Sequence, residues 1–321
     1  MKEIAYRGRF APSPTGLLHF GSLVAALGSY LDARSLGGEW LIRIEDVDRL
    51  RVVAGAADEM LRTLERFGFE WDGEVIYQSR RSEAYEASIQ ELIQAGHAYP
   101  CSCSRKTIRE QAANGPEGPI YPGICRQGMR QPGRANSIRL VTQDRPMDFT
   151  DRLLGPYAQN LGWEVGDFVI RRADGFYAYQ LAVVVDDAWQ GVTHVVRGAD
   201  LLSSTPRQCY LQELLRLSHP EYLHLPLAID RLGRKLSKQD QDLPVDPKQP
   251  MPSLLAALGF LGQTLPEEPP QRVEEFWQWA IAHWRVRDIP TQVSRPLADA
   301  RALINLRNPP QADSAIGDNI K

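Results

Sequence analysis

Apolar residues in the first 70 positions recur with two different periods. A short extended run at the start is broken by a loop containing proline and glycine, and Leu23, Leu27 and Leu31 then recur at helical spacing. Residues 40–44, which are apolar except for Arg43, predict a buried strand, and a second helical pattern covers about residues 54–67. Strands that alternate with helices in this way are typical of a parallel sheet with crossover helices, so we predict an α/β fold.

The pattern changes between about residues 96 and 160, where Gly, Pro and Cys become frequent and basic residues outnumber acidic ones. This composition predicts an inserted module. Beyond it, an Asp-Gly turn between two extended runs predicts a hairpin over residues 168–179. Thr205 and Pro206 are expected to cap the helix that follows a predicted strand at 192–196.

The last 80 or so residues are Pro-rich at first and then contain short helical patterns at 253–261, 273–284 and 298–306. We therefore expect four regions along the chain. The first half of a catalytic domain occupies residues 1–95, an insertion occupies 96–160, and the second half of the catalytic domain occupies 161–240. A helical C-terminal region occupies residues 241–321.

The composition limits the possible partners and compartments. The 321-residue chain has a net charge of −3, so any contact with nucleic acid must use local basic patches. The charged N-terminus does not resemble a signal peptide, and no apolar stretch approaches the roughly 20 residues that span a bilayer. Four cysteines in a chain of this length do not make a disulfide framework. We expect a cytoplasmic monomer.

The first segment that carries chemistry lies between the first strand and the first helix, at residues 9–22. Ligands bind at the carboxyl ends of parallel strands, and the start of a helix attracts phosphate. His19 could donate to phosphate oxygens, and Gly21 would let a nucleotide approach the backbone. Spacing alone is equally compatible with a Pro-rich turn in which His19 only caps the helix or packs.

The order of several motifs resolves this ambiguity. Pro12-Ser13-Pro14-Thr15-Gly16 followed by His19-Phe20-Gly21 resembles the HIGH-type signature of class I aminoacyl-tRNA synthetases in its glutamyl and glutaminyl form. Arg-Ile-Glu-Asp-Val-Asp at residues 43–48 is similar to a second motif of that subgroup, and further matches follow at 185–187, 191–198 and 202–206. The resemblance covers about residues 6–240 and implies a Rossmann-like class I catalytic domain.

The family's second signature, the KMSKS loop, is similar to Arg-Lys-Leu-Ser-Lys-Gln at residues 234–239, although this chain ends the motif in Gln. A mobile lysine there can neutralise charge that builds on the transferring phosphoryl group. The resemblance implies that ATP, with Mg²⁺, binds at His19, Gly21, Lys235 and Lys238. His19, Gly21 and Lys238 are the expected catalytic residues.

Glutamate is the amino acid that the resemblance implies, and it needs cations for two carboxylates and an anion for its ammonium. Glu45 would pair with the ammonium, and Arg197 would form a two-bond fork with the side-chain carboxylate. Without the resemblance, both residues could equally belong to structural ion pairs. The remaining residues that match the family's amino-acid contacts are Arg9, Ala11, Ser13 and Tyr179.

One position departs from the glutamyl-tRNA synthetases. Four residues after Tyr179, where those enzymes have Asn, this chain has Val183. We therefore expect the substrate to make weaker or shifted contacts there.

The inserted module contains Cys101, Cys103 and Cys125, whose thiolates are good ligands for structural Zn²⁺. A structural site usually has four donors, and by residue type His97 is the conventional candidate for the fourth. The resemblance to the glutamyl-Q group, which has a Cys-x-Cys and Tyr-x-x-x-Cys arrangement, implies Tyr121 instead. Three unbound thiols are the alternative.

Only about 80 residues follow the KMSKS-like loop, whereas glutamyl-tRNA synthetases carry a large anticodon-binding region there. The chain therefore resembles the truncated glutamyl-Q tRNA(Asp) synthetase family. That resemblance implies activation of L-glutamate with ATP without tRNA, and transfer to queuosine in the anticodon of tRNA(Asp) across the basic insertion. The alternatives are a ligase that uses a small-molecule acceptor and a non-catalytic RNA-binding paralogue.

Overall fold

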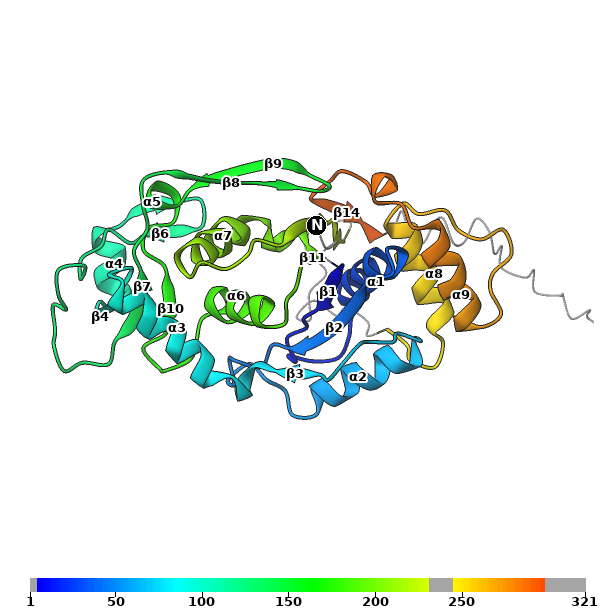
Figure 1. Cartoon of the computed structure of the whole chain (residues 1–321), viewed down its shortest axis with the longest axis horizontal. Coiled ribbons are helices and arrows are strands. Elements are labelled where there is room, and N and C mark those ends of the chain that lie inside the picture. The colour runs from blue at the N-terminus through cyan, green and yellow to red at the C-terminus, as the bar shows by residue number, and fades with distance from the viewer. Residues whose placement is uncertain (1–4, 231–244, 298–321) are drawn as a thin grey trace, which may run out of the picture.

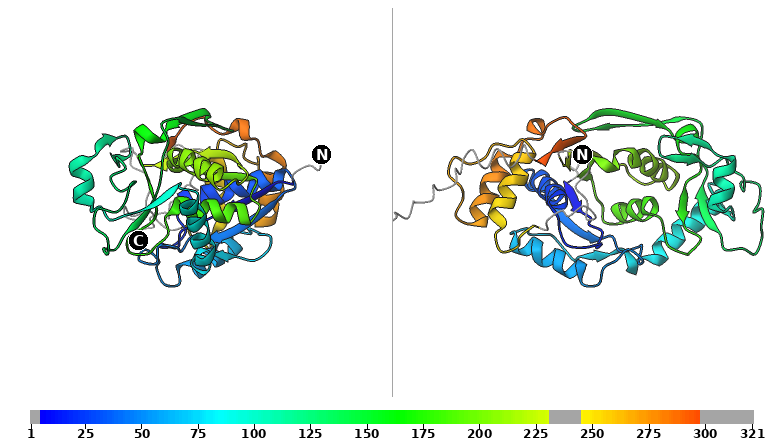
Figure 2. Two further views of the ribbon diagram at one scale, coloured as in Figure 1. Left: turned by 60° about the vertical axis from the view of Figure 1, so that its left-hand side comes forward. Right: turned by 180° about the vertical axis from the view of Figure 1, so that it is seen from behind.

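The computed structural model describes residues 5–230 and 245–297. The molecule is elongated, with a parallel sheet near its centre, the insertion at one end and the C-terminal helices at the other (Figures 1 and 2). The KMSKS-like residues 234–239 and the helix predicted at 298–306 lie outside the described residues. Within the described ranges, the helices are too short or too polar to span a lipid bilayer.

The central sheet is parallel, which confirms the predicted α/β fold. Its two halves meet where the Thr193 N–H donates a 2.9 Å hydrogen bond to the Arg7 carbonyl. From one edge, the parallel strands are β3 (Ile76–Tyr77), β2 (Glu39–Ile44), β1 (Arg7–Phe10), β11 (His194–Gly198) and β12 (Glu221–Leu225).

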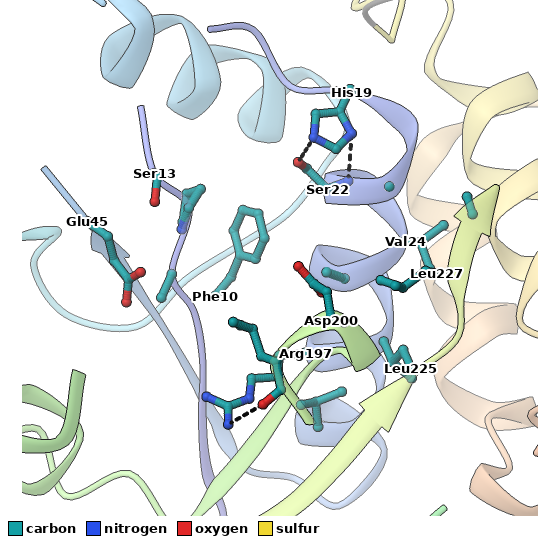
Figure 3. Close-up of a pocket in the computed structure, with 18 of the residues that line it drawn as sticks. Phe10, Ser13, His19, Ser22, Val24, Glu45, Arg197, Asp200, Leu225 and Leu227 are labelled. Carbon is teal, nitrogen blue, oxygen red and sulfur yellow. Dashed lines mark hydrogen bonds between the residues drawn. The ribbon is translucent and has the colours of Figure 1, made fainter. Parts of the chain in front are cut away.

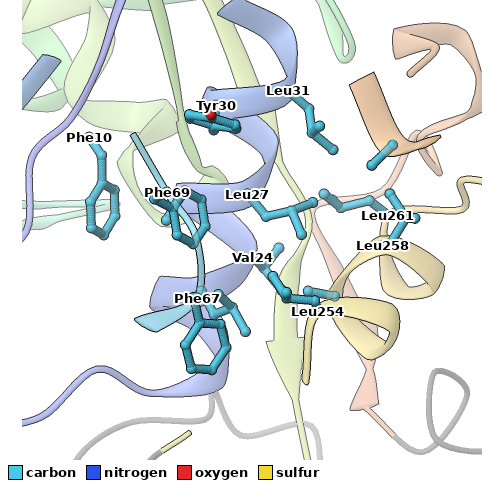
Figure 4. Close-up of a cluster of buried hydrophobic side chains, with 14 of the residues drawn as sticks. Phe10, Val24, Leu27, Tyr30, Leu31, Phe67, Phe69, Leu254, Leu258 and Leu261 are labelled. Atoms are coloured by element: carbon cyan, nitrogen blue, oxygen red, sulfur yellow. The ribbon is translucent and has the colours of Figure 1, made fainter. Parts of the chain in front are cut away.

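Helix α1 (Phe20–Ser35) is central to the core. Leu23, Leu27 and Leu31 are fully buried, as their helical spacing predicts. The helix is buried on several faces because it packs against the sheet on one side and against the two C-terminal helices on the other (Figure 4). Those are α8 (Pro250–Phe260) and α9 (Val273–His283), which confirm the helices predicted at 253–261 and 273–284.

Further helices connect the strands. Four α-helices flank the sheet or lead into the insertion, namely α2 (Ala56–Arg66), α3 (Ser82–Gln94), α6 (Tyr179–Trp189) and α7 (Thr205–Leu214). Short 3₁₀ turns occur at Gln78–Arg80, Ala199–Ser204 and Val286–Asp288. Strand β13 (Leu227–Ile229), which follows β12, pairs in parallel with β14 (Ser294–Pro296) near the end of the described chain.

The insertion is built on an antiparallel sheet of β4 (Ala98–Cys101), β7 (Ser137–Leu140) and β10 (Val169–Arg171). Because β10 pairs with β7, this sheet continues past residue 160. Smaller elements complete it, namely α4 (Arg105–Gln111), β5 (Ala113–Gly115), β6 (Gly118–Ile120) and α5 (Leu161–Glu164).

A two-stranded ribbon returns from the insertion to the central sheet. Its strands, β8 (Pro146–Asp151) and β9 (Gly155–Asn160), are antiparallel, and Figures 1 and 2 show them running along one side of the molecule. At its end, Asp151 pairs with Tyr222 of β12. The next residue, Arg152, binds the buried Asp32 of α1 at 2.6 Å. The ribbon therefore attaches the insertion directly to the catalytic core.

Two local predictions need correction. The hairpin predicted at 168–179 forms, with an antiparallel bridge between Arg171 and Tyr177 and backbone hydrogen bonds from Arg172 to Phe176 and from Ala178 to Ile170. Its second arm is shorter than predicted because Tyr179 already begins α6. Thr205 lies inside α7 rather than capping it, because Ser204 occupies the N-cap. The Thr205 hydroxyl instead donates to the Leu201 carbonyl at 3.2 Å.

Candidate active site

A cavity of about 830 Å³ opens at the carboxyl ends of β1, β2, β11 and β12. This is the edge of a parallel sheet where ligands bind, since the loops after several strands converge there. Lys235 and Lys238 lie outside the described residues. All the other residues predicted for glutamate and ATP line the cavity, namely Arg9, Ala11, Ser13, His19, Gly21, Glu45, Tyr179 and Arg197. Figure 3 shows His19, Glu45 and Arg197 approaching it from three different elements.

His19 both caps α1 and lines the cavity. The Ser22 N–H donates to its Nδ1 at 3.3 Å, and the Ser22 hydroxyl lies 2.9 Å from its Nε2 (Figure 3). A Cβ at Gly21 would lie only 3.2 Å from the His19 ring, so a larger residue there would press on it. The start of the helix, which carries a partial positive charge, borders a space that could hold phosphate.

Two buried arginines share one carboxylate, and of these two only Arg9 lines the cavity. The Asp187 Oδ1 lies 3.2 Å from the Arg9 Nε and 2.8 Å from an Arg43 terminal nitrogen. Burial alone would raise the pKa of Asp187, but the two guanidinium groups outweigh it and lower that pKa. No site role was predicted for Arg43 and Asp187, although both lie inside the matched motifs at 43–48 and 185–187.

Glu45 is less well neutralised. Its side chain is 9 % exposed, and its Oε1 lies 3.5 Å from Arg43 without a hydrogen-bond partner among the described residues. Burial raises the pKa of Glu45 from 4.5 to about 7, although the charges of Arg43 and Arg9 oppose this shift. A carboxylate in this state is suited to a cationic ligand, because a bound ammonium would supply the missing donor.

Arg197 is a buried cation held by neutral acceptors. Its Nε donates to His224 at 3.1 Å, and its terminal nitrogens donate to the Tyr179 hydroxyl at 3.3 Å and the Thr205 hydroxyl at 2.8 Å. The residue is 5 % exposed, and within the described ranges it takes part in no ion pair. The guanidinium is therefore arranged to receive an anion from the cavity.

Val183, where the sequence departs from the glutamyl-tRNA synthetases, is 1 % exposed on α6. It packs in a hydrophobic cluster with Leu181 and Tyr210 and is not among the residues that line the cavity.

A second cluster of potential ligands lies in the insertion. The sulfur atoms of Cys101, Cys103 and Cys125 all lie within 4.8 Å of one another. The Tyr121 hydroxyl lies 3.2 Å from the Cys101 sulfur and 3.5 Å from the Cys103 sulfur. His97 is not part of this group. Three thiols and one phenol oxygen gathered at a point form a four-donor set that suits Zn²⁺.

Comparisons with known proteins agree with this geometry. Residues 5–252 match the family described as tRNA synthetases class I (E and Q), catalytic domain. A glutamyl-Q tRNA(Asp) synthetase from Dechloromonas aromatica is 55 % identical over 290 residues, covering 89 % of this chain and 96 % of the relative. One from Ectopseudomonas mendocina is 54 % identical over 302 residues, covering 92 % and 98 %.

The fold also matches a solved structure. A glutamate-tRNA synthetase from Elizabethkingia anophelis superposes with a TM-score of 0.75 at 23 % identity, covering 94 % of this chain and 70 % of that one.

The raised pKa of Glu45 predicts a pH-dependent cost in stability. The carboxyl is protonated in both folded and unfolded chains below pH 4.5, and between pH 4.5 and about 7 the unfolded chain ionises first. The stability gained from the protonated form is therefore lost as the pH rises through that window. We predict that Glu45→Gln gains on the order of 3 kcal/mol over wild type between pH 4.5 and 8. Urea denaturation of both proteins across this range measures it; a pH-independent difference would contradict the assignment.

Proposed function

Because the chain belongs to the glutamyl-Q tRNA(Asp) synthetase family of class I tRNA synthetases, and is therefore a ligase, we propose that it activates L-glutamate with ATP and transfers it to queuosine in the tRNA(Asp) anticodon. The observation that carries this proposal is the buried Arg197, which faces the same cavity as the under-neutralised Glu45. A cation and an anion arranged in this way suit a ligand that carries both charges.

The charges of the cavity give glutamate one orientation. Arg197 donates two hydrogen bonds to the side-chain carboxylate, and Glu45 accepts a hydrogen bond from the ammonium. Arg9 already shares Asp187, so its remaining donors and the Ser13 side of the loop meet the backbone end of the substrate. The α-carboxylate then lies toward the start of α1, where His19 and Gly21 line the cavity.

Activation of glutamate is an in-line displacement at the α-phosphorus of ATP. The glutamate α-carboxylate attacks the α-phosphorus of ATP, and pyrophosphate leaves in line, so that the products are glutamyl-adenylate and pyrophosphate. No protein nucleophile is needed, because positioning and charge stabilisation supply the rate. When bound with the nucleotide, Mg²⁺ would supply positive charge against the leaving pyrophosphate. His19, the start of α1 and the predicted Lys235 and Lys238 hold the phosphates.

Transfer follows when a queuosine hydroxyl attacks the activated carbonyl, forming an ester and releasing AMP. We place the tRNA across the insertion, whose exposed arginines can bind RNA phosphates. Arg139 is excluded from this role, since it is 9 % exposed and stacks 3.9 Å from the Tyr121 ring. The exposed basic residues in question are Arg105, Lys106, Arg109, Arg130 and Arg134.

We also propose that Cys101, Cys103, Tyr121 and Cys125 hold one structural Zn²⁺. The four donors come from the end of β4 and from residues 121–125, so the metal would tie two segments that share only a small hydrophobic cluster. A small core of this kind commonly depends on a metal for stability.

Replacing Arg197 tests the glutamate site. Lysine keeps the charge but cannot form the two-bond fork, so Arg197→Lys is expected to raise the KM for glutamate about tenfold or more and leave the KM for ATP nearly unchanged. Glutamate-dependent ATP–pyrophosphate exchange gives both constants. Arg145→Lys, a partly exposed arginine paired with Glu213 away from the cavity, is the matched control. Equal effects of the two variants would refute the assignment.

The acceptor can be identified by labelled transfer. We expect radiolabelled glutamate to appear on tRNA(Asp) that contains queuosine, including tRNA whose 3′-terminal CCA has been removed enzymatically. Enzymatic trimming is preferable to periodate because the cis-diol of queuosine would itself be oxidised. A tRNA(Asp) transcript that lacks queuosine should remain unlabelled. Label that disappears with the CCA end, or that enters only a small molecule, would overturn the proposal.

The metal site predicts one zinc atom per purified chain. Cys103→Ser should reduce the zinc content well below one and lower the melting temperature, since a ligand thiolate is lost. Cys209→Ser serves as the control because Cys209 is a buried thiol outside the cluster. Metal analysis by mass spectrometry decides the question: equal zinc content in both variants would argue against these ligands.

A further inference from the structure

We propose that Asp151 and His224 are positioning residues that orient Arg197 toward the side-chain carboxylate of the substrate, so that the end of the ribbon β8–β9 helps to set the preference for glutamate. This inference rests on the proposed glutamate site. Neither residue lines the cavity, so neither touches the substrate.

The three residues lie in a row across three neighbouring strands. Arg197 of β11 and His224 of β12 are register partners in the parallel pair. Asp151 ends β8, beside Tyr222 of the same strand β12. Asp151 is 2 % exposed and His224 is fully buried, so solvent does not compete for their hydrogen bonds.

The hydrogen bonds of Asp151 determine which ring nitrogen of His224 carries the proton. Its Oδ1 accepts from the backbone N–H groups of Leu153 and Leu154 at 3.0 and 2.9 Å. Its Oδ2 lies 3.1 Å from the His224 N–H and 2.7 Å from the ring Nδ1. A carboxylate surrounded by donors can only accept, so Nδ1 must be the protonated nitrogen.

The other ring nitrogen is then an acceptor for Arg197. Nε2 of His224 lies 3.1 Å from the Arg197 Nε, which always carries a proton. Burial lowers the pKa of His224 to about 4, although the hydrogen bond to Asp151 opposes the shift, so the ring is neutral near pH 7. A protonated ring would place two donors and two positive charges face to face.

This arrangement orients the guanidinium without neutralising its outer edge. His224 binds Nε at the inner side, and the Tyr179 and Thr205 hydroxyls each accept from one terminal nitrogen. The Leu201 carbonyl also accepts from the terminal nitrogen that binds Thr205, at the long distance of 3.5 Å, so one of the four terminal N–H groups has no protein acceptor. A carboxylate that took this N–H and replaced the long contact would complete the fork. A negative charge lies one imidazole ring away, on Asp151, which does not line the cavity and so does not occupy the place of the substrate.

The same end of the ribbon is fixed on its other side. Arg152 makes two hydrogen bonds to Asp32 of α1, at 2.6 and 3.1 Å. Adjacent residues of the ribbon therefore contact α1 and, through His224, the cavity arginine. The connection between insertion and pocket is a short chain of buried polar contacts.

Asp151→Asn is the direct test, because it is nearly isosteric. An oxygen is still required by Leu153 and Leu154, so the amide nitrogen would face the ring Nδ1 and force the proton onto Nε2, opposite another donor. We expect the KM for glutamate in ATP–pyrophosphate exchange to rise about tenfold or more, with kcat and the KM for ATP changed much less. The preference for glutamate over glutamine should fall as well.

Asp167→Asn is the matched control. Asp167 is another fully buried carboxylate, bound to Arg126 and Thr142 in the insertion and absent from the cavity wall. Both variants are expected to lower the melting temperature, but only Asp151→Asn should raise the KM for glutamate. Equal KM values in the two variants, or an unchanged KM in Asp151→Asn, would overturn the inference.

If Asp151→Asn does not fold, the variants His224→Gln and His224→Leu test whether His224 positions Arg197. Both remove the ring, but only Gln keeps an acceptor for Arg197, so the Leu variant should have a higher KM for glutamate by about tenfold. Indistinguishable values would refute the positioning role. Absence of glutamate-dependent exchange in the wild-type chain would instead refute the proposed function, so the two failures can be told apart.

Discussion

Buried positive charge is the constraint on which this site depends. Arg9, Arg43 and Arg197 all lie at the edge of the parallel sheet with little or no exposure, and an uncompensated buried charge costs several kcal/mol. Arg9 and Arg43 are compensated directly by Asp187. Arg197 is held by a histidine, two hydroxyl groups and a backbone carbonyl instead, all of them neutral, so its charge stays available to the cavity. That difference leaves Arg197 with the least compensated of the three charges, whereas Arg43, which does not line the cavity, is fixed by its carboxylate partner.

The elements of the core could be predicted from the sequence because their patterns are local. The leucines of α1 and the largely apolar residues 40–44 of β2 both form the predicted elements in the structure. The end of the second arm of the hairpin at 168–179 was harder to predict, since the sequence does not show that Tyr179 already begins a helix. Thr205 was misassigned for a similar reason: a hydroxyl that binds Arg197 and a hydroxyl that caps a helix have the same local signature.

The residues of the candidate site divide in the same way. Those within contiguous motifs, such as His19 and Glu45, could be selected by resemblance, and the structure brings them to one cavity. Asp151 and His224 could not, because their meeting depends on the register between β8 and β12, over a separation of 73 residues. A histidine in an apolar run gives no sign in the sequence of the arginine beside it.

Glu45 and Arg197 both keep unused binding capacity toward the cavity, and such groups reduce stability in exchange for recognition. We propose that these two charges bind the two ends of one amino acid. The most direct measurement is a crystal structure of the chain with L-glutamate bound. We expect the side-chain carboxylate within hydrogen-bonding distance of the Arg197 guanidinium and the ammonium beside Glu45. A glutamate bound in the reverse orientation, or outside this cavity, would contradict it.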